Sequence, residues 1–227
     1  MKGKIIVIEG TDCSGKETQA KMLIEKLVAD GKNVYAKKLS FPMYDTPTGK
    51  IVGGPYLGKD YISESWFPEG CVNVDPKVAS LYYAADRKYN YDKKIKYILE
   101  QGYNIILDRY VESNMAHQGG KIIDSIKRKE MFDFLEKLEY DFLELPRPDL
   151  TVFLYMPYEY SCILKNSRSE KPDGHESSKE HLIHAEKTYL ELAKLYNFKK
   201  IDCVENNIIK TKEQISEEVY GIIKKIL

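Results

Sequence analysis

The sequence predicts a three-layer α/β fold, in which helices flank a five-stranded parallel sheet within one domain spanning residues 1–227. Three observations support this prediction. Short apolar runs alternate with longer stretches of helical periodicity, the pattern typical of successive βα units. The length of 227 residues is natural for one such domain. The chain also contains no internal repeat and no linker long enough to divide it.

The five predicted strands comprise residues 4–8, 34–39, 104–108, 150–155 and 200–203. The first and third contain the continuous apolar runs 5–8 and 105–107, as expected for strands that are covered on both faces of a parallel sheet.

Helices are predicted between these strands. After the first strand, Gly31 suits the end of a helix whose apolar face carries Ala20, Leu23, Ile24, Leu27 and Val28. Asp75 and Pro76 suit the N-cap and first residue of a helix that extends to Gln101. Residues 123–143 are mostly helical.

The last helix begins at a capping box formed by Thr211 and Gln214. Its predicted buried face carries Ile215, Val219, Ile222, Ile223 and Ile226. Two segments lack clear periodicity, residues 53–74 and 166–178. Both are either ordinary surface loops or segments that cover a substrate, because long loops in compact domains are often functional.

The composition narrows the choice of partners. The 35 basic and 35 acidic residues balance, so no broad field favours nucleic acid or an anionic membrane. The four cysteines form no CxxC pair, which favours reduced thiols. Glu9 and Asp12 interrupt the N-terminal apolar run, and no run approaches the roughly 20 residues that span a bilayer. We therefore expect a cytoplasmic protein with no nucleic-acid or membrane partner.

Residues 10–16, Gly-Thr-Asp-Cys-Ser-Gly-Lys, have the spacing of a Walker A loop between a predicted strand and a predicted helix. Glycines let the backbone curl so that N–H groups point inward, and the helix N-terminus adds positive potential. Lys16 supplies a point charge for the β- and γ-phosphates of ATP. The pattern predicts a P-loop NTPase-type fold that binds ATP through Gly10, Thr11, Asp12, Cys13, Ser14, Gly15, Lys16, Glu17 and Thr18.

Glu17 departs from this pattern, because a Ser or Thr that contacts Mg²⁺ usually occupies its position, and Thr18 follows it. A carboxylate there either repels phosphate or holds Mg²⁺ or its waters. We predict the second role, together with Asp12 and Asp108. Unchanged magnesium dependence and turnover in Glu17→Ser would exclude it.

Asp108, Arg109 and Tyr110 end the third predicted strand, where ligands bind in open α/β sheets. At this point the sequence resembles the thymidylate kinase family along most of its length. The resemblance is carried by IEGTDCSGKETQ at 8–19, FPMY at 41–44, YYAADR at 82–87, DRYVESNMAHQGG at 108–120 and a charged lid at about 165–180. It implies a nucleoside monophosphate kinase that transfers phosphoryl from ATP-Mg²⁺ to dTMP in dTTP biosynthesis, and a homodimer.

The resemblance also implies roles for individual residues. Asp12 would contact the sugar hydroxyl of the acceptor and help organise Mg²⁺, unless it only bonds to its own backbone. Arg109 would bridge the acceptor phosphate and the transferring group, since a guanidinium fork suits phosphate oxygens; the alternative is a structural ion pair. Tyr83 would stack on thymine and Arg87 would bond its O4, against the alternative of a core tyrosine and a solvated arginine.

Four further residues complete the implied site. Ser113 and Asn114 would lie at the base, where Asn114 can donate and accept or instead cap a helix. His117 stands where many relatives carry Tyr or Phe near the sugar 2′ position, which leaves the selectivity for deoxyribose open. Tyr44 would contact the acceptor phosphate or pack as a buried tyrosine.

The lid, residues 165–180, carries Lys165, Arg168, Lys171 and Lys179. We expect Arg168 to be the catalytic cation of the transition state, against the alternative of a solvated charged loop. Two rival functions stay open: a kinase for another deoxynucleoside monophosphate or a nucleoside, and a regulatory nucleotide-binding protein that lost catalysis through Glu17.

Overall fold

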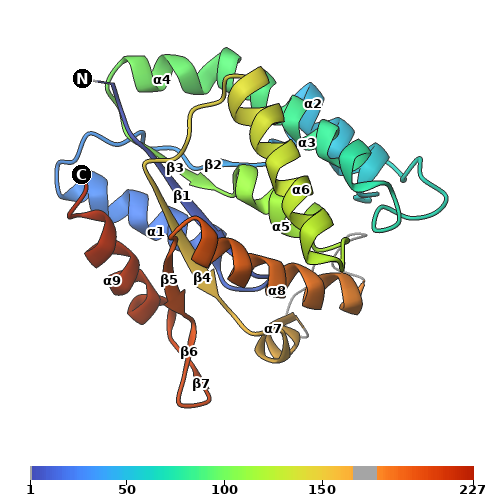
Figure 1. The fold of residues 1–227 in the computed structure, drawn as a ribbon. Coiled ribbons are helices and arrows are strands. Elements are labelled where there is room, and N and C mark those ends of the chain that lie inside the picture. The colour runs from blue at the N-terminus through green and yellow to red at the C-terminus, as the bar shows by residue number, and fades with distance from the viewer. Residues whose placement is uncertain (1, 166–177) are drawn as a thin grey trace.

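The structure, a computed structural model, describes residues 2–165 and 178–227. Its centre is a parallel sheet of five strands in the order β2-β3-β1-β4-β5 (Figure 1). The strands are β1 (Ile5–Gly10), β2 (Leu39–Ser40), β3 (Ile105–Asp108), β4 (Leu150–Tyr155) and β5 (Lys199–Asp202). Helices cover both faces, which confirms the predicted fold class. The larger part of the predicted lid, residues 166–177, lies outside the described residues.

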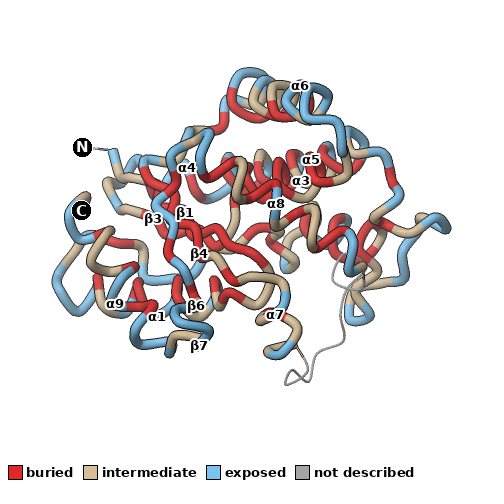
Figure 2. The backbone as a smooth tube through the Cα atoms, turned by 60° about the horizontal axis from the view of Figure 1, so that its bottom comes forward, coloured by how far each residue is buried: buried red, intermediate tan, exposed pale blue. Residues whose placement is uncertain are grey.

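Helices form one layer on each face of the sheet. One layer consists of α1 (Lys16–Ala29) and α9 (Lys212–Ile223); the other includes α3 (Pro76–Asn90), α5 (Val111–Gly119), α6 (Ser125–Glu136) and α8 (Lys179–Leu195). Side chains of β1 alternate between them: Ile6 and Ile8 pack toward α1 and α9, and Ile5 and Val7 toward the opposite layer. Figure 2 shows β1, β3 and β4 buried between these layers. This double coverage explains the continuous apolar runs at the start of β1 and β3.

Several predicted helix signals are confirmed. Asp75 caps α3 through its Oδ1, which accepts from the backbone N–H groups of Lys77 and Val78 at 2.9 and 3.1 Å. Thr211 and Gln214 form the capping box of α9. Three helices continue directly into a π-helical turn. α2 (Pro47–Ile51) continues into η1 (Val52–Tyr56), and α6 continues into η3 (Lys137–Phe142). α3 continues into η2 (Tyr91–Ile95) and then into α4 (Lys96–Glu100).

Two details of the predicted elements are wrong. The second strand is only Leu39–Ser40, while Val34 makes an isolated parallel bridge to Asn104. The chain bends at 36–37 between these pairings, on an edge where a strand has a neighbour on one side only. Val28 is 45% exposed, because it lies at the rim of the apolar face of α1 rather than within it.

Four of the described helices were not predicted: α2, α5, α7 (Tyr158–Lys165) and α8. In α5 every residue except His117 is buried, and several of them are polar, so the usual alternation of apolar and polar positions is absent. A short hairpin, β6 (Val204–Glu205) and β7 (Ile208–Ile209), was also missed.

The segment 53–74 is more ordered than a plain loop. It begins in η1 and encloses a small core of its own, formed by Val52, Tyr56, Leu57, Cys71, Val74 and Ala79. Lys121, beyond the end of α5, donates from Nζ to the carbonyl oxygens of Cys71 and Val74 at 3.0 and 2.9 Å. These bonds fix the segment beside α5. Among the described residues, the helices are all too short or too polar to cross a membrane.

Candidate active site

The loop between β1 and α1 has the geometry that binds phosphate. Cys13 and Gly15 adopt positive φ angles of 58° and 80°, and no side chain caps the start of α1 at Gly15. A Cβ at Gly10 would lie 2.7 Å from the carbonyl oxygen of Leu154, so this position requires glycine. The loop therefore presents uncapped N–H groups at a helix N-terminus, where anions bind.

Lys16 lies within this loop rather than on the surface. Its Nζ donates to the carbonyl oxygens of Gly10 and Thr11 at 3.0 and 2.8 Å. Burial lowers the pKa of Lys16 to about 8, and the charge of Arg109 acts in the same direction. An incoming phosphate would favour the charged ammonium, because an opposite charge stabilises it.

One pocket borders the loop residues that the sequence predicts to bind ATP. It encloses about 980 Å³, and its wall includes Cys13, Ser14, Gly15 and Thr18 of the loop. The opposite wall comes from Ile209 to Glu213 and Ile215, the hairpin and the start of α9. Four of the predicted ATP-binding residues therefore meet in one pocket.

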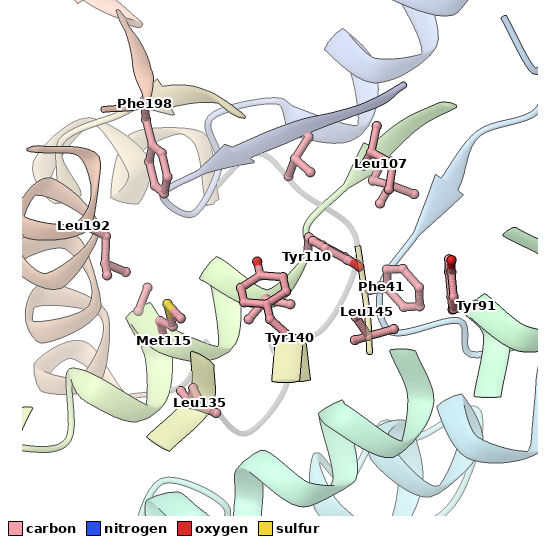
Figure 3. Close-up of a cluster of buried hydrophobic side chains, with 14 of the residues drawn as sticks. Phe41, Tyr91, Leu107, Tyr110, Met115, Leu135, Tyr140, Leu145, Leu192 and Phe198 are labelled. Atoms are coloured by element: carbon pink, nitrogen blue, oxygen red, sulfur yellow. The ribbon is translucent and has the colours of Figure 1, made fainter. Parts of the chain in front are cut away.

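A second pocket, of about 590 Å³, opens on the other side of the same loop. All eight residues predicted to bind the acceptor line it: Asp12, Tyr44, Tyr83, Arg87, Arg109, Ser113, Asn114 and His117. Phe41 and Tyr110 also line it, and both belong to the main core, where their rings lie 6.0 Å apart (Figure 3). The floor of this acceptor pocket is therefore continuous with the packed interior.

Arg109 occupies the end of the pocket nearest the P-loop. Its φ of 69° places a non-glycine residue in the left-handed region, which costs about 1–3 kcal/mol and is typical of functional positions. Its guanidinium contacts are long: 3.7 Å to Asp12, and 3.4 Å to both Ser113 Oγ and Tyr189 OH. Such contacts leave donors of the fork available for phosphate.

Arg87 and Asn114, which the resemblance implies as base-binding residues, both line this pocket. Arg87 is neither solvated nor unpaired: it is buried and forms a bidentate ion pair with Glu139. Burial opposes its charge, but Glu139 outweighs burial and raises the pKa of Arg87. Tyr83 is half-buried, with its ring 5.7 Å from that of Tyr56 in an edge-on arrangement.

His117 and Tyr44 also line the pocket wall. His117 Nδ1 lies 3.2 Å from Nε2 of His181 in α8, and its ring meets Tyr189 edge-on. This pairing fixes the imidazole by contacts outside the pocket. Tyr44 is half-buried beneath Lys59, whose Nζ lies 5.2 Å from the ring centre. Tyr44 therefore packs against Lys59 and also lines the pocket.

The predicted metal ligands are only partly brought together. Asp108 is buried, and among the described residues its Oδ1 has no hydrogen-bond partner, which fits an oxygen ligand for Mg²⁺ or its waters. Burial opposes the charge of Asp12, but Lys16, Arg109 and Lys165 outweigh it and hold the pKa of Asp12 below its usual value. Glu17 instead pairs with Lys38 at 2.6 Å, with its side chain 74% exposed.

Within residues 2–165 and 178–227, no three His, Cys, Asp or Glu side chains cluster as metal ligands. A metal role for Glu17 would therefore require its side chain to leave Lys38, and it stays a prediction. Of the predicted lid cations, Lys165 contacts Asp12 Oδ2 at 3.2 Å and Lys179 lies over the ring of Tyr158. Arg168 and Lys171 lie outside the described residues.

Glu9 is a site residue that was not predicted. It is fully buried, and its carboxylate accepts from the backbone N–H groups of Tyr110 and Ser113 at 2.9 and 3.1 Å. It also accepts from Ser113 Oγ at 2.7 Å and Tyr189 OH at 3.0 Å. Glu9 thereby holds the turn that carries Arg109. A charged residue inside an otherwise apolar strand was the signal that could have found it.

Asp86 of α3 is a second buried carboxylate whose role was not predicted. Its buried carboxylate accepts from the backbone N–H of Met43 at 2.9 Å, from Thr48 Oγ1 at 2.9 Å and from Asn90 Nδ2 at 2.8 Å. It therefore fastens the segment that carries Tyr44 to α3.

The burial of Glu112 in the first turn of α5 predicts that the stability of the folded protein depends on pH. Burial and the nearby Glu9 raise its pKa from 4.5 to about 7. The folded state thus keeps a proton that the unfolded chain releases, so stability falls as the pH rises from about 4.5 to 7. Glu112→Gln should remove about 2 kcal/mol of this fall between pH 5 and pH 8, as measured by urea unfolding at both pH values. Equal pH dependence in variant and wild type would contradict the assignment.

Comparison with known proteins agrees with this geometry. The family model described as thymidylate kinase matches residues 8–215. A probable thymidylate kinase from Pyrococcus abyssi is 30% identical, over 99% of this chain and 97% of the relative. One from Prochlorococcus marinus is 31% identical, over 100% of this chain and 99% of the relative.

Solved structures agree as well. The thymidylate kinase of Candida albicans superimposes with a TM-score of 0.70 at 26% identity, over 99% of this chain and 92% of that one. The one from Ehrlichia chaffeensis, at 22% identity and a TM-score of 0.67, supports the fold alone. Because the family match spans the P-loop, the acceptor pocket and the start of α9, the chain belongs to the thymidylate kinase family.

Proposed function

We propose that this protein transfers the γ-phosphoryl group of ATP to dTMP, giving ADP and dTDP, as a step in dTTP biosynthesis. The observation that carries the proposal is the pair of pockets that one P-loop borders: Asp12 and Arg109 line one, and Cys13, Ser14 and Gly15 line the other. Lys16 lies close enough to Asp12 and Arg109 to interact with both charges. This arrangement lets a donor and an acceptor nucleotide meet end to end at the carboxyl edge of the sheet.

The reaction needs positioning and charge more than proton chemistry. An oxygen of the acceptor phosphate attacks the γ-phosphorus, and the bond to the β,γ-bridging oxygen breaks as ADP leaves. The N–H groups of the loop and Lys16 would hold the donor phosphates. Arg109 would contact both the acceptor phosphate and the transferring group, and so align them and offset the developing charge.

Magnesium fits the site through Asp108 and Asp12. The ion supplies charge neutralisation for the donor phosphates when bound. Asp108 would hold it, directly or through water, with the Oδ1 that lacks a protein partner. Asp12, ionised by its basic neighbours, would orient those waters and the acceptor sugar. Arg168 stays our proposal for the lid cation.

The test is an acceptor panel in a coupled assay of ADP release, with dTMP, dUMP, dCMP, dGMP and thymidine. We expect dTMP to have the highest kcat/KM. The comparison matters because the Candida albicans enzyme has broad substrate specificity. Equal rates for dTMP, dUMP, dCMP and dGMP would defeat the assignment, and ATP binding without dTMP-dependent ADP release would favour a regulatory protein.

The proposal includes a homodimer that works in the cytoplasm. Lys77 of α3 lies over the ring of Phe134 in α6, so these helices are neighbours. Both carry exposed apolar side chains, Val78 and Leu81 on α3 and Ile126 on α6. A face of this kind suits self-association, which sedimentation of the purified protein would measure.

A further inference from the structure

Glu139 lies beneath the base-binding end of the acceptor pocket and belongs to none of the sequence motifs. It is contributed by η3 and is completely buried. Its Oε2 accepts from Arg87 Nε, and its Oε1 accepts from Arg87 Nη2 at 2.5 Å and from Asn114 Nδ2 at 3.2 Å. One carboxylate therefore holds both polar side chains at this end of the pocket.

The bidentate pair fixes the plane of the Arg87 guanidinium. It uses Nε and one proton of Nη2, so the unused donors are on Nη1 and the other Nη2 proton. Nη1 has only a long contact, 3.4 Å to the carbonyl oxygen of Tyr110. Since Arg87 lines the pocket, it offers a hydrogen-bond donor to a bound base.

Glu139 also sets the orientation of the Asn114 amide. Nδ2 faces two acceptors, Glu139 Oε1 at 3.2 Å and the carbonyl oxygen of Ser80 at 3.4 Å. The reversed amide would place an oxygen against two oxygens, so the network selects one orientation. It leaves Oδ1 buried, with no hydrogen-bond partner in the part of the chain that the structure describes. In a side chain that lines the pocket, this oxygen is an acceptor in need of a donor.

We propose that Glu139 is the positioning residue that makes the pocket selective for a pyrimidine with a carbonyl beside a ring N–H, which is the O4 and N3 edge of thymine or uracil. Arg87 then donates a hydrogen bond to O4, and Asn114 Oδ1 accepts one from the N3–H group. Cytosine presents an amino group and an unprotonated N3, so it opposes both protein groups. A site built to hydrogen-bond one pattern rejects the opposite one by several orders of magnitude. The inference rests on the proposed function, because it takes the acceptor to be a nucleoside monophosphate.

The test compares Glu139→Gln and Glu139→Asp with wild type, using calorimetric affinities and kinetics for dTMP, dUMP and dCMP. In Glu139→Gln an NH₂ group replaces one carboxylate oxygen and faces N–H donors of Arg87 or Asn114, so two donors oppose each other. We expect dTMP affinity to fall at least tenfold and the preference for dTMP over dCMP to fall at least tenfold. The ratio of dTMP to dUMP should stay within about twofold, because both bases present the same edge. The KM for ATP should change far less than the KM for dTMP.

Two controls separate this role from a loss of structure. Glu139→Asp keeps the charge that Arg87 needs but is one methylene shorter, so it should fold and show an intermediate loss of selectivity. Glu136→Gln alters a neighbouring carboxylate that pairs with the exposed Arg147 and should leave every ratio unchanged.

An unchanged ratio of dTMP to dCMP affinity in the folded Glu139 variants would overturn the inference while leaving the kinase assignment intact. A wild-type protein that releases no ADP with dTMP but binds it in preference to dCMP would overturn the kinase assignment alone, and a lower preference in Glu139→Gln would then support the inference. Equal affinity of the wild type for dTMP and dCMP would overturn the inference outright.

Discussion

Arg109→Ala is expected to lower kcat for dTMP phosphorylation by about 10³-fold, the range seen when a positioned cation is removed from a phosphoryl-transfer site. The guanidinium lies between Asp12, Ser113 and Tyr189 at contacts of 3.4–3.7 Å, which are too long to be its final partners. A phosphate at this point would replace them with short charge-assisted bonds. Single-turnover and steady-state kinetics with saturating ATP would measure the loss.

The backbone conformation at Arg109 does not confound the comparison of Arg109→Ala with wild type. Arg109 has a φ of 69°, and alanine carries the same Cβ, so the left-handed conformation is equally strained in both. Arg109→Lys should recover only part of the rate, because an ammonium cannot bridge two phosphates as a fork does. The matched control, Arg147→Ala, removes an arginine from an exposed pair with Glu136 and should leave kcat unchanged. A kcat near wild type in Arg109→Ala would move the bridging role elsewhere.

Glu9→Ala is expected to lower the free energy of unfolding by about 3 kcal/mol or more, the usual result of removing one partner from a buried charged network. It would leave four donors without their acceptor, on Tyr110, on Ser113 (backbone and hydroxyl) and on Tyr189. It would also remove a nearby negative charge from Arg109. Urea unfolding followed by circular dichroism would measure the effect.

Glu9→Gln should be milder, since the amide oxygen still accepts from two of the donors. Glu217→Ala is the matched control, because Glu217 pairs with Lys26 at the surface with its side chain 71% exposed. That pair should contribute less than about 1 kcal/mol. If Glu9→Ala were no more destabilising than Glu217→Ala, Glu9 could not be the residue that holds the turn at Arg109.

The phosphate loop was predictable because its signal is local. Seven consecutive residues determine where the backbone curls, and the flanking strand and helix follow directly in the chain. The residues that line the acceptor pocket could be named only through resemblance, because Tyr83 and Arg87 by themselves favour a core tyrosine and a solvated arginine. The fold class followed from apolar runs that the two helical layers cover.

The residues that support the site were not predictable in this way. Glu139 acts on Arg87, 52 positions earlier, and Glu9 acts on Ser113, 104 positions later. Neither belongs to a local pattern, since a buried carboxylate is stable only where the fold brings donors to it. The helix α5 was not predicted for the same reason, because its polar residues are buried by contacts with α3, α6 and α8.

The sequence by itself determined the class of fold, the P-loop and the family, because these depend on residues that are close in the chain or on a match along its whole length. Tertiary structure alone decided that the eight acceptor residues share one pocket, that Glu17 turns to Lys38, and that Glu139 orients both Arg87 and Asn114. These outcomes depend on which charged and polar groups meet after folding, where burial makes each unpaired group costly.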